Sequence, residues 1–478
     1  MLFHSLEFLI FFIIVYTLYL FLDHKKQNIM LLIASYIFYG FWDWRFLSLM
    51  FVSTVIDFYC GRKIDLSDNA KIRKKYLILS VIGNLIILGF FKYFNFFVSN
   101  LVHALNIAGL DINYSTLNII LPLGISFYTL QSLSYTIDIY RKGMKHTNDF
   151  LSFCLFVSFF PQLVAGPIER ARNLLPQMLS KREITLEKFY SGCYMVFWGI
   201  FLKAFIADNL ANMVDPVFVP SPVPYNGIEV LLVSYAFSIQ IFCDFAGYSS
   251  VARGLARMMG FELMVNFNLP YFATSIQDFW NRWHISLSSW VRDYIYMPLF
   301  FSIRRLKGNL KLAAVIMITM AIMGLWHGAN WIFVVWGLYH GSLLAIYMFT
   351  RKYIVKWINP KSKWGQSAWL WIRIIFVFHL ATYGMLIFRA EWGMQIWLLT
   401  KAMLFNFTLK PGLESMLFNL LSLSWVLIVV QLIEFKNNDL LYFYKQPVII
   451  RAALYTVCFL LMIIGGAPSG KEFIYFQF

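Results

Sequence analysis

Residues 312–349 read LAAVIMITMAIMGLWHGANWIFVVWGLYHGSLLAIYMF, an apolar run interrupted once, at the segment GLWHGAN. Both flanks of the run are basic, with Lys311 on one side and Arg351 and Lys352 on the other, so both should lie in the cytoplasm. Gly324 and Gly328 disfavour an unbroken helix through the interruption. We therefore predict a broken or re-entrant helix pair with His327 near its tip, buried in protein or lining a cavity.

The rest of the chain also has the composition of a membrane protein. Of its 478 residues, 60% are hydrophobic, 19% are aromatic and only 13% are charged, whereas about 25% are charged in soluble proteins. Other apolar runs of spanning length lie at 2–22, 192–213, 228–245, 369–388, 416–433 and 448–464. We predict an all-α, polytopic membrane protein with about ten or more transmembrane helices, of which the uncleaved run 2–22 is the first.

The net charge of +16 is concentrated in a few loops. Such clustering is typical of the cytoplasmic loops of membrane proteins and does not indicate nucleic-acid binding. The basic loops are 61–76, 141–146, 180–188, 302–311 and 351–363, whereas loops 108–116 and 215–227 contain no Lys or Arg. We expect the basic loops in the cytoplasm and the other two outside. The same alternation predicts a multi-pass protein of the cytoplasmic (inner) membrane with both termini on the exoplasmic face.

Histidines within apolar runs are the first candidates for function. An ionisable side chain at membrane depth is costly, so it indicates a functional site, and imidazole is suited to moving protons near neutral pH. His327 lies beside two glycines that open the backbone; the alternative is a purely structural histidine. His340 and His379 lie within long apolar helices, where we expect packed and hydrogen-bonded side chains.

A second histidine, His284, lies in SIQDFWNRWHISLSSWVRDYIYMP, residues 275–298. The stretch is too polar for a span that faces lipid and too aromatic for a solvent loop. A continuous helix would place six residues on one face: Ile276, Trp280, Trp283, His284, Leu287 and Trp290. Asp278 and Arg282 would form an i, i+4 pair on another face. We predict an amphipathic helix at the cytoplasmic interface that lines a funnel towards His327; the alternative for His284 is an interfacial histidine bonded to a carbonyl.

Metal and redox chemistry are not indicated by the sequence. The five cysteines are scattered and lie mainly in apolar runs, without a CxxC or HExxH pattern. We expect no metal site and no bound cofactor.

Two longer runs carry a family resemblance. They are CDFAGYSSVARGLARMMGFELMVNFNLPYFATSIQDFWNRWHISLSSWVRDYIYMPL (243–299) and GLWHGANWIFVVWGLYHG (324–341). Both closely resemble the membrane-bound O-acyltransferase superfamily, in particular its bacterial branch of alginate O-acetyltransferases and their D-alanyl-transferring relatives. The segments FFKYFNFF (90–97), LPLGISFYTLQSLSYTIDIYR (121–141) and FFPQLVAGPIERARNLLPQM (159–178) fit as well.

The resemblance implies an architecture for the whole chain. It covers about 88–347 and the last residues, FIYFQF. It implies a single integral-membrane acyltransferase domain, 1–478, whose re-entrant and interfacial helices surround a central tunnel. The further spans and an exoplasmic FIYFQF tail would lie within 369–478.

The resemblance also implies chemistry. His327 matches the intramembrane histidine of the family, and His284 matches its second active-site histidine. The implied reaction is acyl transfer from a thioester to a hydroxyl, in which a neutral imidazole removes the hydroxyl proton. His327 would be this base, and His284 would orient the donor carbonyl or stabilise its oxyanion. Oxyanion or substrate contacts are expected from Asn330, Trp283, Asp278 and Arg282.

The donor implied by the resemblance is acetyl-CoA or an acyl carrier, the latter a cytoplasmic partner. An extracytoplasmic acyltransferase partner would deliver the acyl group to polysaccharide, membrane lipids would surround the chain, and no nucleic acid is expected. The sequence FFSIRR after Pro298 departs from the glycine-rich turn of alginate-type members, so the donor surface is not assigned. Three alternatives remain: D-alanyl transfer from a carrier protein, a polysaccharide or lipid transporter, and a scaffold subunit.

The motif FIYFQF, residues 473–478, resembles a terminal aromatic motif of related envelope-acylation systems. There a tyrosine carries the acyl group outside the membrane. The resemblance implies that Tyr475 is an acyl-relay acceptor. The alternative is an aromatic anchor at the membrane interface.

Overall fold

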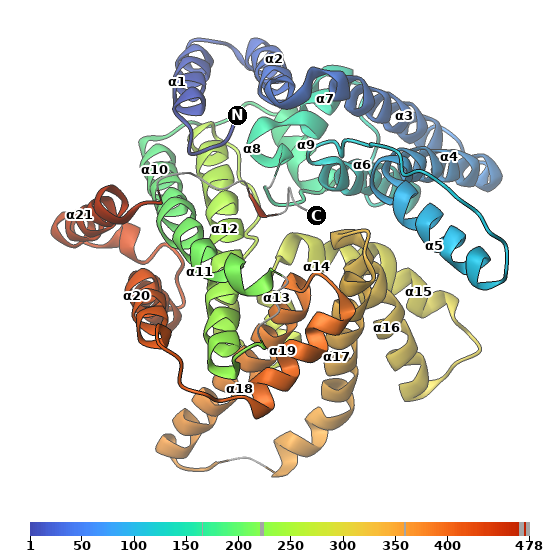
Figure 1. The fold of residues 1–478 in the computed structure, drawn as a ribbon. Coiled ribbons are helices and arrows are strands. Elements are labelled where there is room, and N and C mark those ends of the chain that lie inside the picture. Colours follow the sequence, from blue (N-terminus) through green and yellow to red (C-terminus); the bar gives the residue numbers. More distant parts are fainter. Residues whose placement is uncertain (165, 220–223, 358–359, 468–472, 475–478) are drawn as a thin grey trace. The chain divides into compact units, whose positions relative to one another are not determined.

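Helices, and no strands, make up the described part of the chain in the computed structural model (Figure 1). The description covers residues 1–478 except 165, 220–223, 358–359, 468–472 and 475–478. The chain separates into two compact units, the first made of residues 1–196 and 249–264 and the second of residues 197–248 and 265–478. The prediction of one acyltransferase domain stays a prediction.

Eight described helical stretches are long and apolar enough to cross a membrane: Ala70–Ile107, Leu186–Phe218, Gly227–Met258, Gly308–His327, Trp331–Tyr353, Lys363–Arg389, Leu413–Asn437 and Val448–Gly465. The predicted class, an all-α polytopic membrane protein, is confirmed. The sequence had predicted about ten or more transmembrane helices, which is more than the eight stretches found among the described residues. The run at 2–22 forms a shorter apolar helix, Leu6–Leu20, and the helix Leu47–Asp65 has spanning length but contains charged residues that lower its hydropathy.

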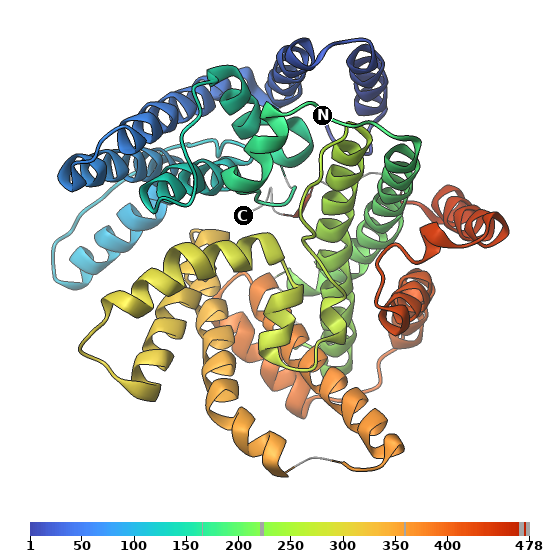
Figure 2. The same cartoon turned by 180° about the vertical axis from the view of Figure 1, so that it is seen from behind.

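Among its described residues the first unit contains nine whole α-helices, the beginning of a tenth and the end of another: α1 (Leu6–Leu20), α2 (His24–Asp43), α3 (Leu47–Asp65), α4 (Ala70–Leu88), α5 (Phe94–Ile107), α6 (Ile125–Tyr140), α7 (Phe150–Ser158), α8 (Phe160–Leu163), α9 (Ala171–Leu179), the beginning of α10 (Leu186–Ile200) and the end of α12 (Gly227–Met258). The short segments η1 (Trp44–Phe46) and η2 (Gly89–Tyr93) join some of them. Helices α3, α4 and α6 lie side by side in Figures 1 and 2.

A buried carboxylate fixes the packing of these three helices. Asp57 on α3 accepts hydrogen bonds from Ser80 Oγ at 2.5 Å and from Asn84 Nδ2 at 2.9 Å, both on α4. Ser132 on α6 also donates to it. A buried charge is tolerated when donors surround it, so this polar cluster joins the three helices in one arrangement.

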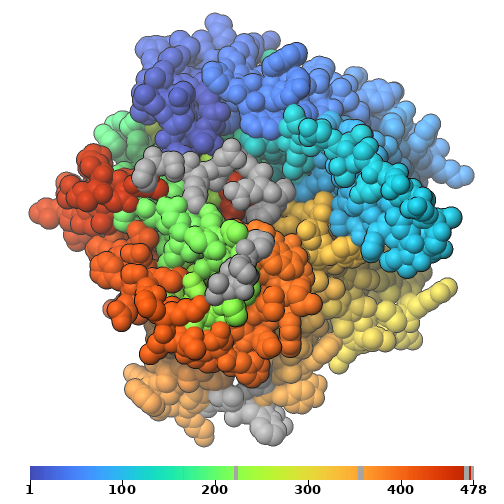
Figure 3. All heavy atoms as spheres, viewed as in Figure 1, coloured from blue at the N-terminus to red at the C-terminus, as the bar shows by residue number. Residues whose placement is uncertain are grey.

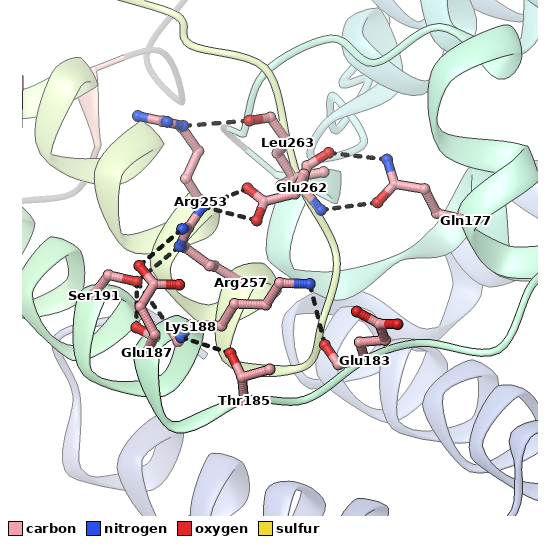
Figure 4. Close-up of polar contacts among 10 residues, drawn as sticks. All are labelled: Gln177, Glu183, Thr185, Glu187, Lys188, Ser191, Arg253, Arg257, Glu262 and Leu263. Carbon is pink, nitrogen blue, oxygen red and sulfur yellow. Dashed lines mark hydrogen bonds and ion pairs between the residues drawn. The ribbon is translucent and has the colours of Figure 1, made fainter.

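The loop 259–264, which follows α12, is held against α9 and α10 by polar contacts (Figure 4). Gln177 donates to the carbonyl of Glu262 at 3.0 Å and accepts from its backbone N–H at 2.8 Å. Arg257 forms an ion pair with the Glu262 carboxylate at 2.7 Å and donates to Ser191 Oγ at 2.8 Å. These contacts determine the path of the loop that ends the first unit.

The second unit contains the remaining helices: η3 (Phe201–Ala207), α11 (Asp208–Phe218), most of α12, η4 (Pro270–Phe272), α13 (Ile276–Arg282), α14 (Ile285–Val291), η5 (Arg292–Tyr296), α15 (Met297–Ser302), α16 (Gly308–His327), α17 (Trp331–Trp357), α18 (Lys363–Arg389), α19 (Gly393–Phe405), α20 (Leu413–Asn437), η6 (Phe443–Lys445) and α21 (Val448–Gly465). Both histidine motifs and the described part of FIYFQF lie in this unit.

The predicted break in the run 312–349 is confirmed. Helix α16 ends at His327, α17 begins at Trp331, and the two helices lie side by side in both views (Figures 1 and 2). A Cβ at Gly324 would lie 2.0 Å from the Phe333 carbonyl oxygen. Because only glycine permits such a close approach of two backbones, α16 and α17 form a tightly packed hairpin.

Apolar side chains cover the outer surface of the last spanning helices. The face in Figure 3 shows α20 and α21 in orange and red; on them Phe418 is 70% exposed and Ile464 is 82% exposed. Soluble proteins rarely expose large apolar patches. A surface of this kind is compatible with lipid.

Candidate active site

His327 lies at the end of α16 and is only 4% exposed. Its ring centroid is 5.0 Å from that of Trp326, 5.0 Å from that of Trp336 on α17, and 5.5 Å from that of Phe388 on α18. All three rings are edge-on to the imidazole. The helix break thus places the predicted base in an aromatic pocket formed by three helices.

His284 does not lie within a continuous helix, and that prediction was wrong. The helix ends at Arg282 and resumes at Ile285, because His284 adopts a left-handed conformation with φ 43° and ψ 53°. Few residues other than glycine adopt this conformation, which costs free energy. A backbone hydrogen bond from Ile285 N to Asn266 O, 2.9 Å long, stabilises the turn.

The six residues placed on one face of the predicted amphipathic helix share one environment despite the break. All six are buried: Ile276, Trp280, Trp283, His284, Leu287 and Trp290. The turn at His284 rotates the chain between two short helices, and hydrophobic spacing on either side of it cannot reveal this. The sequence therefore predicted which side chains lie together but not the backbone that brings them there.

Asn266 orients His284, and sequence reasoning missed it. Its amide oxygen lies 3.1 Å from Nδ1 of His284 and accepts hydrogen bonds from the hydroxyl and the backbone N–H of Ser286, at 2.8 and 3.3 Å. An amide oxygen is an acceptor only, so Nδ1 of His284 carries the hydrogen and Nε2 carries the lone pair. The partner is thus a side-chain amide, not the backbone carbonyl of the alternative hypothesis. The only signal in the sequence was a polar residue, Asn266, between apolar neighbours.

Burial also determines the charge of His284. The side chain is 1% exposed, and desolvation lowers its pKa from 6.5 to about 3. A group with this pKa is neutral throughout the physiological range. His284 is therefore an uncharged imidazole whose Nε2 has the lone pair needed to accept a hydrogen bond.

The two histidines share one aromatic neighbour. The indole of Trp326 lies 5.0 Å from the ring of His327 and 6.2 Å from the ring of His284, measured between centroids. The ring of Phe245, on α12, lies 4.6 Å from His284. Two motifs separated by about forty residues in the sequence thus meet around Trp326.

The expected oxyanion and substrate contacts lie in different places. Asn330 is exposed, and its Oδ1 accepts the N–H of Ile332 at the start of α17. Trp283 is buried against Phe279, with 5.6 Å between ring centroids. Neither arrangement tests a role in catalysis.

Asp278 and Arg282 form the predicted i, i+4 pair, with Nε 2.8 Å from Oδ1. Asp278 also accepts the backbone N–H of Thr274 at 3.0 Å, and Arg282 donates to the carbonyl of Asn268 at 3.3 Å. Both side chains therefore connect α13 to the segment that precedes it. A contact of either residue with substrate remains a prediction.

Two further histidines in spanning helices, His340 and His379, differ from each other. His379 is hydrogen-bonded as expected, through Nδ1 to the carbonyl of Ile375 at 2.7 Å and through Nε2 to the hydroxyl of Tyr235 at 2.8 Å. His340 is fully buried among aromatic rings, including that of Trp336 at 4.9 Å. Neither of its ring nitrogens has a hydrogen-bond partner among the described residues. For His340 the expected packing is confirmed, but the expected hydrogen bonding was wrong.

A cavity of about 380 Å³ opens between α13, α14, η5, α16 and α17. Its apolar lining includes Ile285, next to His284, and Met323, one turn before His327 on α16. Polar side chains line it as well: Gln277, Asn281, Ser288, Ser289, Arg292 and Thr319. Neither His284 nor His327 is among its lining residues, but the cavity lies on the same helices and has a mixed polar and apolar surface.

Comparisons with known proteins find similarity along most of the chain. The model of the MBOAT, or membrane-bound O-acyltransferase, family matches residues 140–388. The probable alginate O-acetylase AlgI of Azotobacter vinelandii is 39% identical over 464 residues, which cover 94% of this chain and 86% of that protein. The peptidoglycan O-acetyltransferase of Helicobacter pylori is 34% identical over 379 residues, or 72% of this chain and 70% of that protein.

A more distant relative transfers a different group. The teichoic acid D-alanyltransferase of Bacillus subtilis is 33% identical over 282 residues, which cover 57% of this chain and 70% of that protein. The range matched by the family model includes both His284 and His327.

Proposed function

This chain belongs to the membrane-bound O-acyltransferase family, as its motifs predicted, and we propose that it transfers acetyl groups across the membrane. The donor is a cytoplasmic thioester, and the acetyl group is destined for O-acetylation of an extracytoplasmic polysaccharide. Family membership makes the chain an acyltransferase and not a transporter or scaffold. The similarity to an alginate O-acetylase along 94% of the chain supports acetyl over D-alanyl transfer.

The observation that carries the proposal is the pair of buried imidazoles beside Trp326. An alcohol attacks a thioester effectively only when a base takes its proton. We assign this role to His327. The hydroxyl oxygen bonds to the acyl carbon, the proton passes to the imidazole, the C–S bond breaks, and the proton then passes to the departing thiolate.

The tautomer of His284 determines which hydrogen bonds it can make with substrate. Because Nδ1–H donates to Asn266, Nε2 of the neutral ring accepts hydrogen bonds and cannot donate one to an oxyanion. We therefore assign His284 to orienting a hydroxyl or amide N–H of the substrate. Oxyanion stabilisation requires a donor, for which the amide group of Asn330 is the candidate.

The cavity between α13, α14, η5, α16 and α17 supports a thioester donor with an extended arm. Its apolar lining matches an alkyl chain, and its serine, glutamine and asparagine side chains match amide groups along such an arm. Both acetyl-CoA and an acyl carrier protein present their thioester in this form. An alternative donor and group, D-alanine on a carrier protein, is supported by the Bacillus subtilis relative.

Tyr475 is the proposed first acceptor, from which an extracytoplasmic acyltransferase partner would take the acetyl group. It lies outside the described residues, so the assignment rests on the resemblance of FIYFQF. The relay requires the proposed orientation in the inner membrane, with both termini exoplasmic. The competing hypothesis is an aromatic interfacial anchor.

Turnover of the donor by purified protein in lipid nanodiscs tests the proposal. The His327→Ala variant should lose acetyl transfer by at least about a hundredfold, the contribution of one general base. His379→Ala is the matched control, because it also removes an intramembrane histidine, one whose two nitrogens are hydrogen-bonded. Near-normal transfer by His327→Ala would contradict the assignment of the base. Transfer from a D-alanyl carrier but not from acetyl-CoA would select the alternative function.

The relay has its own test. Tyr475→Phe removes only the hydroxyl oxygen and keeps the aromatic ring. This variant should bind donor and insert normally but fail to acetylate polymer, and the wild-type peptide should carry a base-labile acetyl mass. Full polymer acetylation by Tyr475→Phe would reduce the motif to an anchor and leave the assignment of His327 intact.

A further inference from the structure

A buried ion cluster lies where η3 and the start of α11 meet α12 in the second unit. Lys203 Nζ lies 2.8 Å from Asp208 Oδ1 and 2.9 Å from Asp244 Oδ1, and all three side chains are buried. Burying charges is costly even when they are paired. Within membrane helices such groups indicate function.

The cluster binds the backbone of the FIYFQF segment. The N–H of Ile474 donates to Asp244 Oδ2 at 2.7 Å, and this hydrogen bond is buried. This hydrogen bond adds to the contact that the Asp244 carboxylate makes with Lys203. The carboxylate of Asp244 therefore binds Lys203 with one oxygen and the segment with the other.

Phe473, the residue before Ile474, is also buried. Phe473 is 0% exposed. Its ring lies 4.5 Å from that of Tyr248 and 5.5 Å from that of Phe245, both on α12. Phe245 in turn lies 4.6 Å from His284, so a continuous row of rings connects the segment to the candidate active site.

Two features of the backbone bring Lys203 close to Asp244: a π-helical turn and a close approach of two helices. Residues 201–207 form a π-helical turn, a distortion that is frequent at functional sites. A Cβ at Gly247 would lie 2.7 Å from the carbonyl oxygen of Gly199, so the two helices approach at a distance that only glycine permits. Lys203 and Asp244 are thereby held together without exposure to lipid.

We propose that Lys203 and Asp244 form a docking site for Phe473 and Ile474, the first two residues of FIYFQF, and that this site holds the chain at Ile474 beside the aromatic wall of His284. Asp244 and Lys203 are then positioning residues for the acyl acceptor. The role in acceptor positioning rests on the proposed function, because Tyr475 follows Ile474 by one peptide bond. The docking itself rests on the contacts of Phe473 and Ile474.

Substitution of Ile474 isolates the hydrogen bond. Ile474→Pro removes the N–H donor and leaves the ion cluster intact, whereas Ile474→Val keeps the donor and serves as the matched control. In full-length protein in nanodiscs, hydrogen-exchange mass spectrometry should show faster exchange of the 473–478 peptide in the proline variant, by about tenfold, as expected for a lost bond to a charged acceptor. The valine variant should exchange like the wild type.

A second pair of variants tests the cluster. Asp244→Asn and Asp208→Asn each remove one negative charge beside Lys203, but only Asp244 contacts the segment. Faster exchange of the 473–478 peptide is expected for Asp244→Asn and not for Asp208→Asn. Equal exchange in Ile474→Pro and wild type, or equal effects of the two aspartate variants, would overturn the docking site.

Acetyl transfer to polymer separates the docking site from the relay. If Ile474→Pro loosens the segment and lowers transfer by about tenfold while donor binding is unchanged, docking and acceptor positioning are both supported. Loosening with full transfer would support the docking site and overturn its role in positioning the acceptor. Polymer acetylation by Tyr475→Phe tests the relay separately: full acetylation by this variant would contradict the relay and leave the docking site unaffected.

Discussion

The amide oxygen of Asn266 lies 3.1 Å from Nδ1 of His284. This single contact determines which nitrogen of a buried, neutral imidazole faces substrate. It also joins the strained turn at His284 to the segment that precedes α13. Orientation, tautomer and backbone conformation of the histidine thus depend on one asparagine.

Replacing Asn266 should therefore lower the rate of catalysis, although we assign Asn266 no contact with substrate. Asn266→Ala frees the ring of His284 to rotate, and misplacement of an active-site group by about 1 Å can lower the rate a hundredfold. We expect kcat to fall by about 10- to 100-fold with little change in KM. An unchanged kcat in nanodisc assays would show that the contact is only structural.

Asn266→Asp should introduce a pH dependence. The new carboxylate would raise the pKa of His284 above its value of about 3. Below the raised pKa the ring is protonated and Nε2 can no longer accept a hydrogen bond, so transfer should begin to fall at a higher pH in the variant than in the wild type. Superimposable pH–rate profiles of the two proteins would contradict the assigned role of Nε2.

The backbone at His284 gives a prediction about stability. At φ 43° a glycine avoids the steric cost that an alanine incurs. Both His284→Gly and His284→Ala lose the ring and should be impaired in transfer. The glycine variant, however, should be more stable by about 1 kcal/mol, measured by thermal unfolding in detergent. An alanine variant of equal or greater stability would argue that the left-handed turn is absent.

The hairpin of α16 and α17 gives a prediction about packing. Alanine at Gly324 would clash with the Phe333 carbonyl, so Gly324→Ala should destabilise the protein by about 3 kcal/mol. Gly393→Ala, at the start of α19, meets no atom within 4 Å and is the control. If both variants melt at the wild-type temperature, the close approach at Gly324 is not present.

Cysteine labelling tests the proposed orientation. Single cysteines at 71–75 and 304–307, in a cysteine-free background, should be protected from an impermeant reagent in intact cells. Cysteines at Asn113 and Pro222 should react. Labelling of the loop 304–307 from outside would exclude a cytoplasmic start for α16 and, with it, the proposed donor side.

The sequence predicted the features that depend on composition and on local spacing. The helical membrane class, the break at GLWHGAN and the common face of the residues around His284 follow from hydrophobic periodicity and from glycines. The left-handed turn at His284 does not, because its hydrogen bonds come from Asn266, eighteen residues away. Likewise the lysine–aspartate cluster that binds Ile474 joins residues that are far apart in the sequence, so no local pattern predicts it.

The length of α16 has a consequence for the energetics of export. Its 20 residues rise about 30 Å, the thickness of the hydrocarbon core of a bilayer. Under the proposed orientation, the basic loop at its start and His327 at its end are separated by nearly this whole distance. An acyl group that leaves its thioester beside His327 has then already made most of the crossing inside the protein. Cleavage of the thioester would supply the free energy both for the new ester and for vectorial movement, without an ion gradient or nucleotide hydrolysis.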